Sequence, residues 1–528
     1  MGARAGFASD RGAAMETVFD LLVVGGGVNG AGIARDAAGR GLAVLLVERE
    51  DLASHTSSAS TKLIHGGLRY LEYGEFRLVR EALRERERLL RIAPHIIRPL
   101  QFVLPHDTGM RPAWVIRAGL FLYDHLARRE QLPASRALDL TAYGPATTLK
   151  PAFQRGFAYW DCWVDDSRLV VLNAQDAAAR GARISTYTAL LSASPQGDFW
   201  VAQIGDAATG CRRSIRARAI VNAAGPWVEE VLKTRLGCGA SQSIRLVKGS
   251  HIVVPRMHPG EHAYILQNPD KRIVFVIPYE GDFTLIGTTD VAFDGDPASV
   301  SASGEEIAYL CASVNRYFQR HVSAADVLHS YSGVRPLYDD RRANASAVTR
   351  DYVLRVEGGE RTPPLLSVFG GKITTYRRLA EHALEKLLPL LGRPATGAWT
   401  ATAPLPGGDL GGRRVEKYAA QLQARHPLLA GALLERMARA YGSASETVLA
   451  GARTMADLGA DLGGGMHERE VEYLARREWA RTAADVLWRR SKCGLHCSAE
   501  GVARIDRFLS AIAPRASAAA CSAPASVR

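Results

Sequence analysis

The chain has 528 residues, which suggests about two to four domains with a substantial core. Its hydrophobic content of 47% and charged content of 23% are ordinary for a globular protein, and the lack of any run of about 18 apolar residues excludes a spanning helix. The formal net charge of +12 favours anionic partners such as phosphorylated metabolites, acidic lipid or nucleic acid.

The ends of the chain and its cysteines give little sign of targeting or metal binding. Residues 1–17 contain no apolar stretch of the kind found in secretory signals, so we expect a disordered extension, with Met15 as an alternative start. The seven cysteines predict no disulfide framework. Cys493 and Cys497 form one close pair, but no second pair completes a zinc site, so no metal is expected.

A strand, a glycine turn, a helix, a second strand and an acidic residue follow the extension. In order these are residues 21–24, the G-x-G-x-x-G of Gly25, Gly27 and Gly30, residues 31–40, residues 42–47, and Glu48. This order is the dinucleotide-binding fingerprint in its required context. Gly25 permits the tight turn, Gly27 lets the backbone approach a pyrophosphate, and Gly30 lets the helix pack closely on the strand. The helix N-terminus then offers N–H groups to the phosphates, and Glu48 can accept hydrogen bonds from a ribose without a 2′-phosphate.

A hydroxyl-rich loop and a pair of glycines come next, in the run SSASTKLIHGGLRYLE at 57–72. The hydroxyls can bond phosphate and ribitol oxygens, and the two glycines allow the backbone to lie against a flat group. This run strongly resembles the signature of the FAD-dependent glycerol-3-phosphate dehydrogenases of the aerobic, respiratory type. Further matches are DCWVDD at 161–166, YSGVRPL at 331–337, TRDY at 349–352 and FGGKITTYR at 369–377.

The resemblance implies an α/β fold with three parts. A Rossmann-type FAD-binding domain carries an inserted antiparallel-sheet substrate domain that caps the flavin, and a helical domain follows. The expected boundaries are 18–395 for the oxidoreductase region, 396–412 for a linker, 413–515 for the helical domain and 516–528 for a disordered tail. A hairpin around residues 280–282 is predicted within the cap.

The cofactor-binding prediction combines the fingerprint with the segments that match the family. These residues are Gly25, Gly27, Gly30, Glu48, Ser57, Ser58, Ser60, Thr61, Lys62, Gly66, Gly67, Ala224, Gly225, Gly370, Gly371, Lys372, Ile373, Thr374 and Thr375. The cofactor is expected to be non-covalent FAD. Position 61 is a threonine where many relatives are expected to carry serine, so the hydroxyl is retained.

The implied reaction oxidises sn-glycerol 3-phosphate to dihydroxyacetone phosphate. A phosphate dianion needs cations, and the matched positions supply Arg69, Arg335, Arg350 and Lys372. A base must take the proton of the C2 hydroxyl. His65 is the first candidate and His251 the second, because imidazole titrates near neutral pH.

Two helices of the expected first domain differ in character. Residues 75–92 are predicted to be a surface helix, with the pairs Glu85/Arg88 and Glu87/Arg91 on its exposed side. Residues 112–129 mix aromatic and basic side chains, which is typical of a helix at a membrane interface, and an ordinary core-facing helix explains the pattern as well.

The family resemblance implies that electrons pass to a membrane quinone. We therefore expect a cytoplasmic protein in peripheral contact with the anionic inner face of the cytoplasmic membrane. A homodimer is compatible with the sequence, which does not determine the oligomeric state.

Three alternatives remain open. An oxidase would pass electrons from the same substrate to oxygen, and an amino-acid oxidase of the same fold would place its cations for a carboxylate. A basic nucleic-acid-binding protein would cluster its charges in a recognised module, whereas here the charges are spread, so no nucleic-acid partner is expected.

Overall fold

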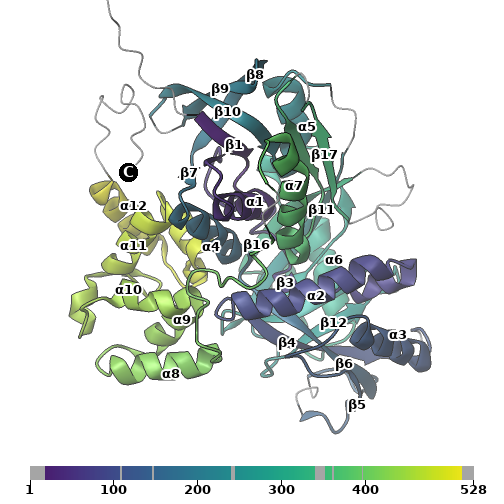
Figure 1. Cartoon of the computed structure of the whole chain (residues 1–528). Coiled ribbons are helices and arrows are strands. Elements are labelled where there is room, and N and C mark those ends of the chain that lie inside the picture. Colours follow the sequence, from purple (N-terminus) through teal and green to yellow (C-terminus); the bar gives the residue numbers. More distant parts are fainter. Residues whose placement is uncertain are drawn as a thin grey trace, which may run out of the picture.

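The computed structural model describes residues 18–107, 110–144, 148–207, 209–239, 244–338, 351–359, 362–394 and 397–513. It contains an eight-stranded sheet flanked by helices, a ten-stranded sheet, and a separate group of C-terminal helices (Figure 1). The predicted α/β fold class, with its cap sheet and helical domain, is confirmed. The expected disordered ends, 1–17 and 516–528, lie outside the described residues.

The first sheet has the order β17-β18-β10-β1-β2-β7, with β9 and β8 continuing from β10. Its strands are β1 (Val18–Val24), β2 (Val44–Val47), β7 (Arg183–Ser185), β8 (Thr188–Gln196), β9 (Phe199–Asp206), β10 (Arg212–Asn222), β17 (Val353–Glu357) and β18 (Leu365–Phe369). The pairs from β18 through β10, β1 and β2 to β7 are parallel. β1 and β2 are almost wholly buried, as expected for parallel strands covered on both faces.

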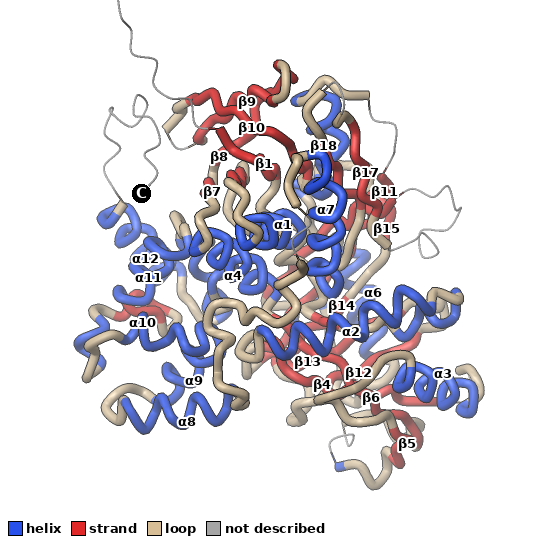
Figure 2. The backbone as a smooth tube through the Cα atoms, viewed as in Figure 1, coloured by secondary structure: helices blue, strands red, loops and turns tan. Residues whose placement is uncertain are grey.

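Three helices lie against this sheet. They are α1 (Val28–Gly39), α4 (Asp166–Ala179) and α7 (Tyr376–Leu390), and α1 packs between the other two (Figure 2). Small residues on α1 make this packing possible: a Cβ on Gly32 would lie 2.7 Å from the Tyr376 ring of α7. Because β1, β2 and β10 run parallel, their carboxyl ends lie at the same edge of the sheet. This is the edge at which α/β sheets bind their ligands.

The second sheet has the order β15-β11-β14-β13-β12-β4-β6-β3, with β16 paired to β11 and β5 to β6. Its strands are β3 (Leu63–Ile64), β4 (Ile97–His106), β5 (Arg136–Asp139), β6 (Arg155–Val164), β11 (Ile244–Pro255), β12 (Ala263–Gln267), β13 (Ile273–Tyr279), β14 (Phe283–Gly287), β15 (Val291–Ala292) and β16 (His329–Tyr338). The predicted hairpin is the antiparallel pair β13–β14. The accompanying helices are α2 (Phe76–Ile92), α3 (Ala113–His125) and α6 (Gly304–Asn315), whereas the short α5 (Val228–Glu230) packs against β18 of the first sheet.

The C-terminal part is helical, with one short hairpin, and has its own apolar core. Its elements are α8 (Val415–Arg425), α9 (Gly431–Tyr441), α10 (Ser445–Leu449), β19 (Asp461–Gly463), β20 (Met466–His467), α11 (Glu468–Glu478), the π-helical turn η10 (Asp485–Arg490) and α12 (Ala499–Ile512). The predicted linker is packed: Leu405 is buried, and its N–H donates to the Ile92 carbonyl at 2.9 Å.

Across the described part of the chain, every helix is too short or too polar to cross a bilayer. α2 also differs from its predicted surface role. Glu85 and Glu87 are buried, and Glu85 forms a bidentate pair with Arg377 of α7 at 2.7 and 2.8 Å. The predicted pair Glu85/Arg88 forms, at 2.5 Å. The prediction that this face is exposed was wrong, because Arg377 of α7 contacts Glu85 and the backbone N–H groups of residues 130–131 donate to Glu87.

Candidate active site

A first cavity of about 150 Å³ lies where β1, β2 and β10 end. Gly25 turns sharply there with φ +111°, and a Cβ on it would lie 2.5 Å from the Ala223 carbonyl oxygen. A Cβ on Gly30 would lie 2.0 Å from the Gly25 carbonyl oxygen. Glycine is therefore required at both positions, as the fingerprint predicts.

Glu48 lines this cavity with its carboxylate held by two backbone groups. The Gly26 N–H donates to Oε2 at 2.7 Å and the Glu50 N–H donates to Oε1 at 2.9 Å. Burial raises the pKa of this carboxyl. Each carboxylate oxygen accepts more than one hydrogen bond, so these contacts orient Glu48 while leaving capacity for ribose hydroxyls.

The loop after Glu48 closes over the glycine turn. Ser57 Oγ accepts a hydrogen bond from the Val28 N–H at 3.0 Å, so one of the helix N-terminal donors meets protein rather than phosphate. Ser60 Oγ donates to Asp166 at 2.7 Å, and Lys62 Nζ lies 2.9 Å from the same carboxylate with only 2% of Lys62 exposed. Ser60 and Lys62 thus use their side chains to fix the loop.

A second cavity of about 300 Å³ continues from the first. The two share the lining residues Gly27, Thr56, Ser57, Ala223, Gly225 and Pro226. Such a groove suits an extended dinucleotide, with the flat ring system at the second cavity. The glycine turn against Ala223, the carboxylate at the ribose end and this continuity all fit FAD.

The structure brings many predicted residues together around these two cavities. Those on the walls are Gly25, Gly27, Glu48, Ser57, Ser60, Thr61, His65, Ala224, Gly225, His251, Arg335, Gly370, Gly371, Lys372, Ile373 and Thr374. The predicted residues that line neither are Gly30, Ser58, Lys62, Gly66, Gly67, Arg69 and Thr375. Arg350 lies outside the described residues.

His251 and His65 face the second cavity from different elements. His251, on β11, is 2% exposed and stacks on the Tyr331 ring at 4.8 Å. Its Nε2 lies 3.0 Å from Thr61 Oγ1, and its Nδ1 has no hydrogen-bond partner among the described residues. Burial, with Lys62 and Arg335 nearby, lowers the pKa of His251 well below its ordinary value. His65 is half-buried, and its backbone N–H donates to Thr374 Oγ1 at 3.2 Å.

The cations are placed differently from one another. Arg335, on β16, pairs with Asp290 at 2.6 Å and donates to the Thr289 carbonyl at 3.0 Å. Lys372 Nζ lies 3.7 Å from the centre of the Tyr70 ring. Arg69 instead donates to the Tyr73 hydroxyl at 3.4 Å on an exposed surface, so its predicted substrate role stays a prediction.

Several wall residues were not predicted. Asn29 occupies an x position of the fingerprint, and its side chain donates to the Gly370 carbonyl at 3.2 Å, which joins the first glycine turn to the last. Tyr70 stands inside the family motif, so its position was visible in the sequence. Phe275 lies on β13 and Thr288 directly follows β14, and neither carries a local signal of a site. Across the described chain, no cluster of His, Cys, Asp or Glu could hold a metal ion.

Comparison with known proteins agrees with this geometry. The family model described as FAD dependent oxidoreductase matches residues 20–377, and the model described as C-terminal domain of alpha-glycerophosphate oxidase matches residues 398–519. Glycerol-3-phosphate dehydrogenase from Pseudomonas aeruginosa is 56% identical over 497 residues, covering 94% of this chain and 96% of that protein. The chain belongs to the FAD-dependent glycerol-3-phosphate dehydrogenase family.

Two further relatives refine this assignment. D-erythritol 1-phosphate dehydrogenase from Brucella abortus is 53% identical over 93% of this chain and 97% of its own length. The glycerol-3-phosphate dehydrogenase of Bacillus halodurans, solved in complex with FAD, matches with a TM-score of 0.71 at 26% identity over 94% of this chain and 95% of that chain. FAD is the cofactor of this protein, as predicted.

Proposed function

We propose that this enzyme oxidises sn-glycerol 3-phosphate to dihydroxyacetone phosphate and passes the electrons to a membrane quinone. The observation that supports it most is the second cavity, whose walls bear Arg335, Lys372, His65 and His251 next to the dinucleotide groove. FAD, when bound, supplies the hydride acceptor. The rest of the chemistry falls to the side chains of these walls.

Arg335 and Lys372 are suited to the substrate phosphate. A guanidinium presents a planar fork that matches phosphate oxygens, and Asp290 with the Thr289 carbonyl fixes its orientation. Lys372 lies against the Tyr70 ring, which restricts the reach of its long side chain. The phosphate would be held at two points, which orients the C2 carbon for reaction.

His65 remains the preferred base for the C2 hydroxyl. A base works best when its pKa lies near the working pH. The depressed pKa of His251 makes its protonated form unfavourable, so it suits a neutral hydrogen-bonding role. The hydrogen bond between Thr61 Oγ1 and His251 Nε2 fixes the orientation of the His251 ring at the cavity wall.

Anaerobic mixing of the purified holoenzyme with substrate, while flavin absorbance is recorded, tests the proposal. Glycerol 3-phosphate should bleach the flavin within turnover time, and free glycerol or an amino acid should do so far more slowly. D-erythritol 1-phosphate is the matched competitor, because the Brucella relative is named for it. Faster bleaching by D-erythritol 1-phosphate, or by an amino acid, would overturn the proposed substrate.

The electron acceptor is tested separately. After anaerobic reduction, addition of a quinone should restore the oxidised flavin spectrum faster than air-saturated buffer does. Rapid reoxidation by oxygen with release of hydrogen peroxide would instead establish an oxidase.

The membrane part of the proposal places the protein on the inner face of the cytoplasmic membrane. α3 supports it, because Trp114 and Phe121 are 72% and 57% exposed on a helix that also carries Arg117. Nearby Tyr73 and Phe76 are 45% and 47% exposed, and the short helix that contains Tyr73 packs against α3. Exposed aromatic groups beside basic ones suit the interface of an anionic bilayer.

A further inference from the structure

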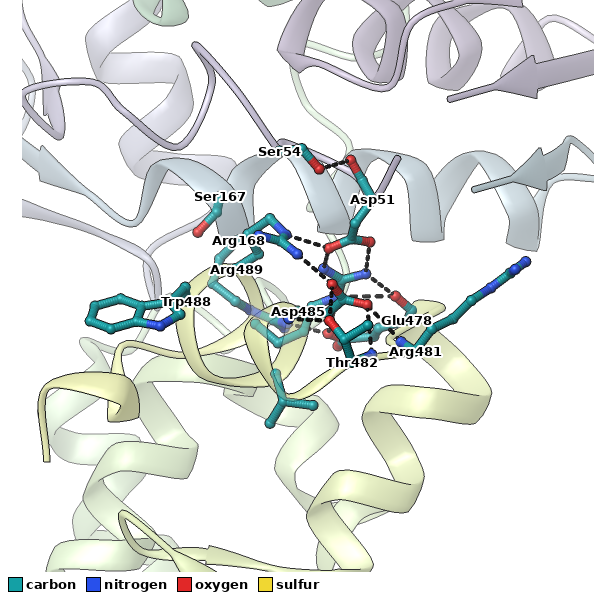
Figure 3. Close-up of polar contacts among 12 residues, drawn as sticks. Asp51, Ser54, Ser167, Arg168, Glu478, Arg481, Thr482, Asp485, Trp488 and Arg489 are labelled. Atoms are coloured by element: carbon teal, nitrogen blue, oxygen red, sulfur yellow. Dashed lines mark hydrogen bonds and ion pairs between the residues drawn. The ribbon is translucent and has the colours of Figure 1, made fainter. Parts of the chain in front are cut away.

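A buried cluster of charges joins the helical domain to the loop that follows Glu48 (Figure 3). Asp51 stands at its centre with 1% exposure. Arg490 of η10 forks onto its carboxylate at 2.6 and 2.7 Å, and Arg489 Nε reaches the same carboxylate at 2.6 Å. Arg490 is itself fully buried. Both arginines of the helical domain therefore bind one acidic residue of the oxidoreductase region.

Asp51 is placed to control one wall of the first cavity. It comes three residues after Glu48 and starts the turn through residues 53–57, which line that cavity. Ser54 Oγ donates to the Asp51 carbonyl at 2.6 Å, and the turn ends at Ser57, the residue that accepts from the first N–H of α1. Moving Asp51 would move the groups that face the cofactor.

The same C-terminal segment also holds the opposite wall. The Tyr187 hydroxyl donates to the carboxylate of Asp485 in η10, with both carboxylate oxygens at 2.9 Å, and the Thr188 N–H donates to the Glu48 carbonyl at 2.7 Å. Residues 188–190 line the first cavity. Arg489 donates to both Asp51 and Asp485, so it connects the contact at one wall of the first cavity to the contact at the other.

We propose that Asp51 and Arg490 are positioning residues for FAD: their pairing holds the cofactor loop closed, so the helical domain sets how slowly FAD is released. Buried ion pairs add little net stability compared with apolar packing of the same volume, but they demand one geometry. Here that geometry fixes a loop against the cofactor groove. The proposal rests on FAD binding and not on which phosphorylated alcohol is oxidised.

The test compares FAD release from full-length holoenzymes after dilution into FAD-free buffer, followed by the rise in flavin fluorescence. Asp51→Asn, which keeps the shape but removes the charge, and Arg490→Met should each release FAD at least about tenfold faster than the parent. Arg490→Lys, which retains charge without the fork, should fall between them and the parent.

Arg168→Met is the matched control. It breaks another buried pair between the same two parts, Arg168 with Glu478, and Arg168 lies on α4 and lines neither cavity. Glu478 also accepts from Arg490 through its backbone carbonyl at 3.0 Å, but Arg168→Met removes no atom that contacts Asp51 or Arg490. It should lower the apoprotein's thermal midpoint by a similar amount while changing FAD release by less than about threefold. Equal acceleration by Arg168→Met, or parental release by Asp51→Asn, would overturn the proposal. If Arg490→Met does not fold, the near-isosteric Asp51→Asn decides alone.

Discussion

At the scale of single residues, the cofactor groove depends on glycines whose missing side chains leave room for FAD. Gly27 lines both cavities, and a Cβ placed on it would meet just Ser57 Oγ, at 3.1 Å. Its backbone conformation is one that any residue adopts. The protein itself therefore tolerates a small side chain at Gly27, and the space that a larger one would fill belongs to the cofactor.

Replacement of Gly27 separates folding from cofactor binding. Gly27→Ala should fold and bind FAD weakly, whereas Gly27→Leu should fold but purify colourless. The ratio of flavin to protein absorbance measures binding, and far-UV circular dichroism confirms folding. Full yellow colour in Gly27→Leu would show that the cofactor does not pass this turn.

Binding of the substrate phosphate should depend on the planar guanidinium of Arg335. Arg335→Lys keeps one positive charge but loses the fork, so kcat/KM for glycerol 3-phosphate should fall by about 10-fold or more. The loss on free glycerol should be much smaller, since glycerol has no phosphate to hold. Steady-state kinetics on both substrates measures the difference. Equal proportional losses would remove Arg335 from phosphate binding.

The proton acceptor is tested by replacing each histidine. His65→Asn should slow flavin reduction by about 10²–10⁴-fold, the usual range for a positioned base, with FAD binding little changed. Stopped-flow reduction across a pH series measures it. His251→Asn, which keeps one amide donor and acceptor near Thr61, serves as the comparison and should slow reduction less. The reverse order of the two losses would assign the base to His251.

At the scale of elements, α7 joins the two sheets through a buried arginine. Arg377, 1% exposed, forks onto Glu85 of α2 and also pairs with Glu381 on its own helix. The contact ties a helix packed beside the cap sheet to a helix of the first sheet. Neither carboxylate has water around it to replace the cation.

Arg377→Met should therefore lower the free energy of unfolding by about 3–5 kcal/mol, because Glu85 and Glu381 would stay buried with only one arginine each, Arg88 and Arg378. Arg378→Met is the neighbouring control: that side chain is 29% exposed and shares Glu381 with Arg377, which remains to neutralise it, so its loss should cost clearly less than the loss of Arg377. Chemical unfolding followed by circular dichroism measures both. Similar costs for the two variants would mean that the Arg377 pair contributes no more than a surface pair.

At the scale of the whole molecule, membrane attachment should involve α3. Replacing Trp114, Phe121 and Arg117 together should reduce sedimentation with anionic vesicles and lower activity with a vesicle-borne quinone. Activity with a water-soluble dye should be unchanged, because none of these three side chains lines either cavity. Leu428→Ser, at a residue 68% exposed on the helical domain, is the control and should sediment like the parent. Undiminished pelleting of the triple variant would exclude α3 as the anchor.

The sequence by itself determined the groove, because its signals are local. Spacing of Gly25, Gly27 and Gly30 between two apolar runs permits one backbone path, and Glu48 must follow the second strand. The glycine pair Gly370–Gly371 was recognisable for the same reason. Family resemblance then supplied FAD, the cap sheet and the helical domain, all of which were confirmed.

The tertiary structure alone decided which polar side chains face the cofactor and which hold the frame. Lys62 and Ser60 belong to the motif, yet both turn to Asp166, which lies more than a hundred residues away. Asp51 and Arg490 pair across more than four hundred residues. The sequence alone does not show whether a charged side chain will be surrounded by water or by another element of the fold. Its partner is fixed by how the elements pack, and burial then makes that partner obligatory.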